Sequence, residues 1–156
     1  MGIRGAVSGD APVVARVWYD GWRDGHLGHI PEALVAVRTR ESFDVRAAER
    51  VGDTTVYEVD GQVAGFVMVV NDEVEQVYLA ADHRGSGLAA ILLAEAERQV
   101  KANGYDTAWL AVVEGNARAR RFYERQGWIS DGPFDYQASS AEGPIAVPCL
   151  RYLKRV

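Results

Sequence analysis

Residues 74–128 read VEQVYLAADHRGSGLAAILLAEAERQVKANGYDTAWLAVVEGNARARRFYERQGW, and this stretch decides the fold. A strand ends at Leu79, a glycine-containing turn follows, and apolar residues recur at helical spacing from Leu88 onward. A buried-type strand at 107–113 and a second helix at 116–126 come next. The stretch therefore predicts strand, turn, helix, strand and helix in that order.

The segments on either side add strands and helices to this unit. Residues 54–59, 62–70 and 74–79 are rich in Val, Tyr and Phe, and Asp60-Gly61 and Asn71-Asp72 between them favour hairpin turns, so we expect an antiparallel meander. The other predicted elements are a strand at 3–7, a helix N-capped by Asp10, an irregular stretch at 23–40 with a short helix from Pro31, a helix after Thr39 or Ser42, and strands at 129–137 and 145–153.

The predicted fold class is α/β of the α+β kind. It has a mixed, mostly antiparallel twisted sheet flanked by helices, in the order β-α-α-β-β-β-α-β-α-β-β. The chain shows no repeat, linker or break in composition, so we expect one domain over residues 1–156.

Composition limits the class of protein. The chain has 156 residues, of which 48% are hydrophobic and 25% charged, as in an ordinary globular protein. A net charge of -5 argues against nucleic-acid binding. The start lacks a secretory signal, no apolar run could cross a bilayer, and Cys149 is the single cysteine. We expect a cytoplasmic protein that binds neither nucleic acid nor membrane, and a homodimer stays open.

The turn Arg84-Gly85-Ser86-Gly87-Leu88-Ala89 is suited to hold an anion. Its glycines allow backbone N–H groups to approach a ligand, and the helix beginning there presents its positive dipole end to a pyrophosphate. A dinucleotide fingerprint is the competing interpretation, with Glu114 as its acidic residue. It is disfavoured because five residues separate Leu79 from the first glycine and no second parallel half follows.

The turn and the following helix together resemble the GCN5-related N-acetyltransferases (GNAT). The family's nucleotide motif, Gln/Arg-x-x-Gly-x-Gly/Ala, is filled by Arg84, Gly87 and Ala89. Its second signature, Asn-x-x-Ala-x-x-Phe-Tyr-Glu-x-x-Gly-Phe, is matched from Asn116 onward, with Trp128 in place of the last Phe. The resemblance implies an N-acetyltransferase that moves an acetyl group from acetyl-coenzyme A to the primary amine of a small molecule or peptide.

The same resemblance assigns residues to the cosubstrate. Backbone groups of Leu79 and Ala81 would bond the pantetheine arm like an added strand, and Asn116 would bind near it. Many members have proline where this chain has Ala81. The turn that would hold the pyrophosphate consists of Arg84, Gly85, Ser86, Gly87, Leu88 and Ala89.

Two side chains are the predicted catalytic groups. An alkylammonium has a pKa near ~10.4, so the acceptor needs a base, and Glu75 shares a face with Val77 and Leu79 if the strand is unbulged. Apolar neighbours there would raise the pKa of Glu75. A bulge would switch its facing and could free an N–H for the thioester oxygen. By the resemblance, Tyr123 protonates the departing thiolate.

The competing interpretation makes Glu75 a solvated hairpin residue, and solvation is favoured for Glu73. Trp18, Trp22 and His26 could wall the acceptor pocket, where acidic and aromatic residues suit a small cationic amine. The two histidines in residues 23–40 have no third candidate ligand near them, so we expect no metal site. The remaining expectation is that Cys149 is a core residue.

A different class of function also stays open. The chain could be a coenzyme A binding or sensing module that has kept the fold and lost the chemistry. The catalytic residues proposed above favour the enzyme.

Overall fold

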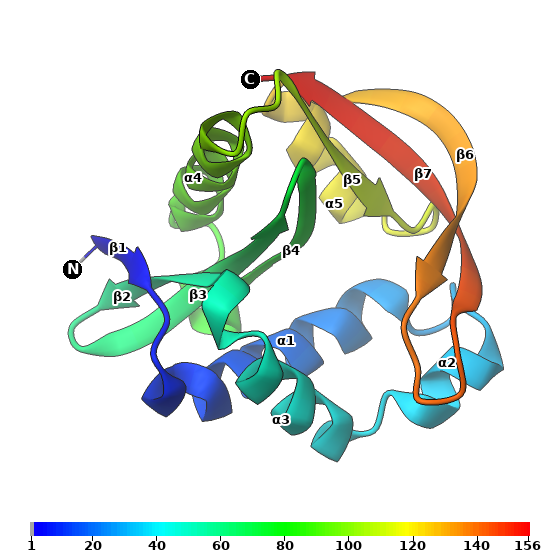
Figure 1. The fold of residues 1–156 in the computed structure, drawn as a ribbon, viewed down its shortest axis with the longest axis horizontal. Helices are drawn as coiled ribbons and strands as arrows, with labels where there is room; N and C mark the ends of the chain where they lie inside the picture. Colours follow the sequence, from blue (N-terminus) through cyan, green and yellow to red (C-terminus); the bar gives the residue numbers. More distant parts are fainter. Residues whose placement is uncertain (1) are drawn as a thin grey trace.

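The computed structural model describes residues 2–156, in which seven strands form one mixed sheet (Figure 1). The sheet has the order β1-β2-β3-β4-β5-β7-β6, and its pairs are antiparallel except for the parallel pair β4–β5. This is the predicted fold class. The strands are β1 (Gly2–Gly5), β2 (Thr54–Val59), β3 (Gln62–Val70), β4 (Glu73–Leu79), β5 (Thr107–Val112), β6 (Ile129–Ala138) and β7 (Ile145–Arg155).

Helices cover both faces of the sheet (Figure 1). Apolar side chains of α4 and α5 pack with β3, β4 and β5 in one core, and those of α1 and α3 pack with β2 and β3 in a second. The central strand β3 is buried on both faces, which fits its continuous apolar sequence. The helices are α1 (Ala11–His26), α2 (Glu32–Val37), α3 (Arg40–Glu49), α4 (Leu88–Ala102) and α5 (Ala117–Arg125).

The meander is confirmed with its two tight turns. Asp60 and Gly61 have φ of 51° and 78°, and Asn71 has φ of 56°. These left-handed values are the ones that short hairpin turns between twisted strands require. Strands β2 and β3 have the predicted ends, and β4 begins one residue earlier than expected, at Glu73.

The N-terminal elements differ from the prediction in detail. Asp10 precedes α1, but its carboxylate makes no cap bond to that helix. It accepts hydrogen bonds from the Arg4 guanidinium at 2.8 and 3.0 Å and from the Val7 N–H at 2.8 Å. Asp10 is therefore the N-cap residue of α1 as predicted, but its carboxylate pairs with the strand residue Arg4 in place of a cap bond.

The stretch 23–40 is more helical than expected. α1 continues to His26, and α2 begins directly after Pro31. Of the two predicted starts for the next helix, Thr39 is the N-cap, since its hydroxyl oxygen accepts a hydrogen bond from the Ser42 N–H at 3.2 Å.

The sheet divides between β4 and β5. These parallel strands are in register at one pair only, Glu73 with Trp109, and they diverge beyond it (Figure 1). The β4 edge toward Leu79 is therefore left unpaired on this side, while β5 continues alongside β7. This divergence opens the middle of the sheet, and the functional site lies there.

Candidate active site

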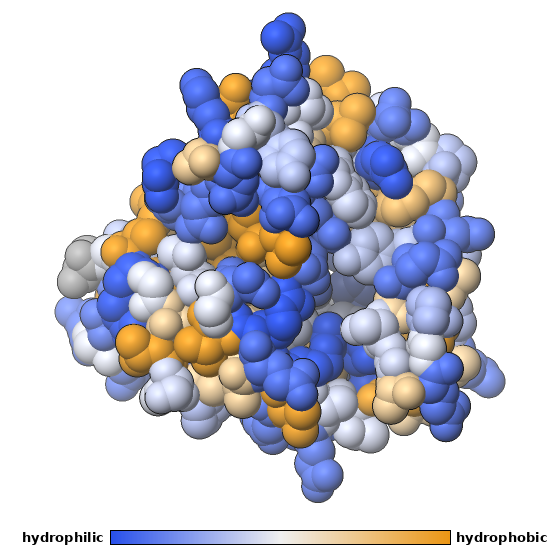
Figure 2. All heavy atoms as spheres, in the orientation of Figure 1, coloured by the Kyte–Doolittle hydropathy of each residue, from blue (hydrophilic) through white to orange (hydrophobic). Residues whose placement is uncertain are grey.

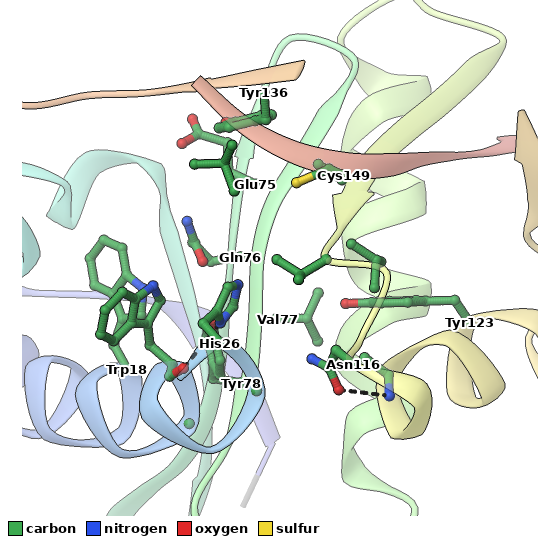
Figure 3. A pocket seen from close by; sticks show the side chains of 18 of the residues that line it. Trp18, His26, Glu75, Gln76, Val77, Tyr78, Asn116, Tyr123, Tyr136 and Cys149 are labelled. Carbon is green, nitrogen blue, oxygen red and sulfur yellow. Dashed lines mark hydrogen bonds between the residues drawn. The ribbon is translucent and has the colours of Figure 1, made fainter. Parts of the chain in front are cut away.

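A cavity of about 600 Å³ occupies the opening between β4 and β5. Residues from all five helices and from β4, β5, β6 and β7 line it. Figure 2 shows the hollow on this face of the molecule, with hydrophilic side chains along its rim. Figure 3 looks into it, with Trp18 and His26 on one side, Asn116 and Tyr123 on the other, and Glu75 at one end. The structure therefore brings most of the predicted site residues together.

The β4 edge presents backbone groups to this cavity. The Ala80 N–H donates to the Ala64 carbonyl at 2.8 Å, so Ala80 bonds toward β3. Because bonding directions alternate along a strand, Val77 and Leu79 direct their N–H and C=O groups to the open side. Ala81 already belongs to a 3-10 turn, and its carbonyl accepts the Arg84 N–H at 3.3 Å. Val77, which the sequence analysis did not assign to the cosubstrate, thus presents its backbone groups to the opening together with Leu79.

A β-bulge lies in β4 at Glu75. Val69 pairs with Val74 and Met68 pairs with Gln76, which leaves Glu75 as the extra residue. The Glu75 carboxylate accepts hydrogen bonds from the Arg50 guanidinium at 3.2 and 2.9 Å.

This bulge gives Glu75 the second of its two expected facings, the one predicted for a bulged strand. Val77 and Leu79 pack into the core on the α4 side, whereas Arg50 follows α3 on the opposite face. The extra residue reverses the side-chain alternation at that point. The expected apolar surroundings of Glu75 are likewise replaced by a guanidinium.

Glu73 is not the solvated residue that the sequence suggested. It is half-buried at the cavity wall, and its carboxylate accepts a hydrogen bond from the Tyr136 hydroxyl at 2.6 Å. Burial, with a smaller contribution from the charge of Glu75, raises the pKa of Glu73 to about 7. Tyr136 lies on β6, 63 residues further along the chain, so the hairpin sequence alone could not reveal this contact.

Glu73→Gln should change how stability depends on pH. The raised pKa means that the folded protein binds more protons than the unfolded chain between pH 4.5 and about 7. The contribution of Glu73 is then fully present at low pH and is lost as pH rises through that window, by on the order of 1 kcal/mol. The measurement is the free energy of unfolding in urea at several pH values. The free energy of unfolding of the wild type minus that of Glu73→Gln should fall as pH rises. The same difference for the exposed control Glu41→Gln should stay constant. An equal pH dependence of the two differences would refute the assignment.

The glycine turn presents free donors at the start of α4. Gly85 and Gly87 have φ of 79° and 84°, which glycine adopts without strain. Within residues 2–156 the N–H groups of Gly85, Gly87 and Ala89 have no hydrogen-bond partner. Arg84 pairs with Asp24 of α1 at 2.7 Å. Arg84, Gly85 and Ala89 line the cavity, and Ser86, Gly87 and Leu88 lie in the turn beyond it.

Asn116 caps α5 at the junction of two helices. Its side-chain oxygen accepts the Ala119 N–H at 3.3 Å, which satisfies the first turn of the helix. Gly25 of α1 makes room for it, since a Cβ there would lie 2.6 Å from the Asn116 side-chain nitrogen. The Asn116 side chain therefore joins α5 to α1 at the cavity (Figure 3).

Tyr123 projects from α5 into the cavity (Figure 3). Its hydroxyl makes no hydrogen bond within the described chain, and burial raises the pKa of Tyr123 above its usual value, so the phenol stays protonated. Trp128, which departs from the family motif, is buried and donates to Glu97 of α4 at 3.2 Å. The larger ring therefore anchors the end of α5 to the core without entering the cavity.

The aromatic residues of α1 have two roles. Trp18 is only 1% exposed and packs edge-on to Phe43 and Phe66, yet it also lines the cavity. Trp22 stacks on His26, with ring centroids 5.7 Å apart. Burial lowers the pKa of His26, so its ring is neutral near pH 7.

The remaining expectations concern Cys149, metals and membranes. Cys149 is buried at the cavity wall, and burial raises its pKa to about 11, so it is a thiol at neutral pH. Residues 2–156 contain no group of three His, Cys, Asp or Glu arranged to hold a metal ion. Over the same residues, no helix is both long and apolar enough to cross a membrane.

The arginines at the cavity wall that sequence reasoning missed include Arg38, Arg46 and Arg50. The last two stand four residues apart, Arg46 on α3 and Arg50 at its C-cap, a spacing that places both on one side of the helix. The spacing of these arginines is visible in the sequence, but nothing in the sequence shows that this helix face meets the bulge in β4.

Comparison with known proteins agrees with this geometry. The model of the acetyltransferase (GNAT) family matches residues 17–128. Streptothricin acetyltransferase of Streptomyces lavendulae is 29% identical over 155 residues, covering 92% of this chain and 74% of that protein. This relative is aligned along nearly the whole chain.

Two solved structures share the fold. A GCN5-related N-acetyltransferase from Rhodopseudomonas palustris has a TM-score of 0.75 at 16% identity, covering 99% of this chain and 94% of that one. The PaiA N-acetyltransferase from Thermoplasma acidophilum, solved with coenzyme A, has a TM-score of 0.71 at 17% identity, covering 99% and 98%. Since the family model spans well over half of the chain and both motifs, the chain belongs to the GNAT acetyltransferase family and is a GNAT N-acetyltransferase.

Proposed function

We propose that this enzyme transfers the acetyl group of acetyl-coenzyme A to a primary amine by direct attack within the β4–β5 opening. The observation that carries the proposal is the free β4 edge between the glycine turn and Tyr123. Leu79 and Val77 offer backbone groups to the pantetheine amides, and the turn from Arg84 to Ala89, with its unpartnered N–H groups, suits the pyrophosphate. PaiA, which shares the fold, was solved with coenzyme A.

The chemical step needs a proton acceptor for the ammonium. We assign this role to the two carboxylates of β4, Glu75 as predicted and Glu73 beside it. A pKa of about 7 for Glu73 suits proton transfer at neutral pH. The Arg50 guanidinium holds Glu75 in place.

The transfer then proceeds in two stages. The amine nitrogen bonds to the thioester carbon while its proton passes to a carboxylate, directly or through water. The resulting oxyanion accepts a hydrogen bond from the Val77 N–H, which the bulged strand directs into the opening. The C–S bond then breaks, and the departing thiolate takes the proton of the Tyr123 hydroxyl.

Amine-dependent thiol release tests this function. The purified protein is given acetyl-coenzyme A with and without a mixed panel of primary amines, and free thiol and acetylated products are measured. Turnover should require an amine. Tight coenzyme binding without amine-dependent thiol release would support the sensing module.

Carboxylate variants test the proton acceptor. Glu75→Gln and Glu73→Gln should each lower kcat more at pH 7 than at pH 9, because an amine that is already neutral needs no base. The measurement is the pH profile of kcat for both variants, with exposed Glu41→Gln as control. Losses that are the same at every pH would return the base role to water or another group.

A further inference from the structure

The acceptor end of the cavity carries an excess of positive charge. Arg38, Arg46 and Arg50 all line it, together with the carboxylates of Glu73 and Glu75. Arg50 is neutralised by Glu75 in a two-bond contact and also pairs with Asp53 at 3.1 Å. Glu73, with a pKa of about 7, is only partly ionised at neutral pH. No carboxylate of the described chain therefore remains for Arg38 and Arg46.

Arg46 is the unsatisfied member of this cluster. Its Nη1 atom is buried and has no hydrogen-bond partner within residues 2–156. The guanidinium is held against rings, with its carbon 4.2 Å from the centroid of Trp18 and 5.3 Å from that of Phe43. Burial and the nearby charge of Arg38 lower the pKa of Arg46 to about 10, which still leaves it charged at neutral pH.

Arg38, at the same end of the cavity, does have a hydrogen-bond partner. Its Nη2 donates to the Ser139 carbonyl at 2.6 Å, which ties the end of α2 to the β6–β7 loop. A buried guanidinium that lacks such a partner is costly, because it has lost water without gaining a hydrogen bond or counter-ion. Arg46 lines the cavity, so an anion bound there would supply the missing counter-ion, with the fork geometry that guanidinium groups recognise in carboxylate and phosphate.

We infer that the acetyl acceptor is a zwitterion: an amine that also carries an oxyanion, which binds Arg46 while its ammonium faces the carboxylates of β4. This inference rests on the proposed function and narrows its substrate class. It narrows the sequence-based expectation of a small cationic amine, which rested on the residues of α1 and did not include Arg46.

The stacked position of Arg46 makes it specific for a compact anion. Trp18 is fixed in the core by Phe43 and Phe66, so the guanidinium resting on it has a defined plane. A defined plane favours a two-bond contact with one carboxylate or phosphate group over loose attraction to any negative charge.

Matched substrate pairs test the inference in the wild-type enzyme. Amino acids are compared with their amides, and phosphoethanolamine with ethanolamine, in acetyl-coenzyme A turnover assays. At least a tenfold higher kcat/KM is expected for the anionic member of one pair, carried mainly by KM. The two pairs separate carboxylate from phosphate recognition. Equal kcat/KM within both pairs, or a preference for the amides and ethanolamine, which lack the anionic group, would overturn the inference while leaving amine-dependent transfer intact.

Variants of Arg46 test whether this residue causes the preference for the anionic substrate. Arg46→Gln should abolish the preference within the favoured pair, and Arg46→Lys should retain part of it, since a charge remains without the fork. Arg23→Gln is the matched control, because Arg23 also lies over a ring, that of Tyr19 at 5.3 Å, but outside the cavity. A preference that survives in folded Arg46→Gln would contradict the assignment. If that variant does not fold, Arg46→Lys and the wild-type pairs still decide the question.

Discussion

Tyr123→Phe should lower kcat at least tenfold and, where release of the thiolate limits the rate, by roughly 10²- to 10⁴-fold, as is typical for loss of a general acid. The substitution removes only a hydroxyl that makes no hydrogen bond within residues 2–156, while the ring keeps its contacts with Phe122 and Trp128. Acetyl-coenzyme A affinity and thermal stability should therefore change little. The measurements are single-turnover rates, calorimetric affinity and melting temperature.

A poor leaving group should enlarge this defect. A thiol with a pKa near ~8.5 leaves fairly well unaided, so the natural cosubstrate understates the need for an acid. Tyr57→Phe serves as control, because Tyr57 packs against the same core but does not line the cavity. Full activity of Tyr123→Phe with both natural and poor leaving groups would remove the acid role and leave the transferase class in place.

Gly87→Val should weaken acetyl-coenzyme A binding by roughly tenfold to a hundredfold. Gly87 has φ of 84°, which a β-branched residue adopts only with strain. A side chain there would meet no atom within 4 Å, so the effect comes from a changed backbone and not from a clash. The turn would then no longer aim its N–H groups at the pyrophosphate, and each such bond to a charged group is worth about 1.5–3 kcal/mol.

Gly61→Val is the matched control for this turn. Gly61 has a similar φ of 78° and equally open surroundings, but it lies in the β2–β3 hairpin, away from the cavity. Calorimetry should show normal affinity in Gly61→Val and weak binding in Gly87→Val, both in folded protein. Unchanged affinity in Gly87→Val would mean that the pyrophosphate binds elsewhere.

Local sequence was sufficient for the strands and for most helices, although the predicted order has two helices between the first and second strands where the structure has three. The hydrophobic periodicity that distinguishes helices from strands is visible within short continuous segments. Examples are the helix from Leu88 and the meander with its turns at Asp60-Gly61 and Asn71. The two family motifs lie in continuous segments, so the family too could be recognised before any contact was known. The N-cap position of Asp10 could be predicted in this way, whereas the pairing of its carboxylate with Arg4 could not, because that contact comes from another element.

The electrostatics of the site were decided by tertiary structure alone. The bulge at Glu75 depends on how β3 and β4 pair, and it turns that carboxylate from the apolar face toward Arg50. The pKa of Glu73 depends on burial beside Tyr136 of β6. The free charge of Arg46 depends on which helix face meets the opening. Sequence determines which groups exist and their local spacing, whereas burial and charge pairing arise between segments far apart in the chain, and these set each group's protonation and what it can bind.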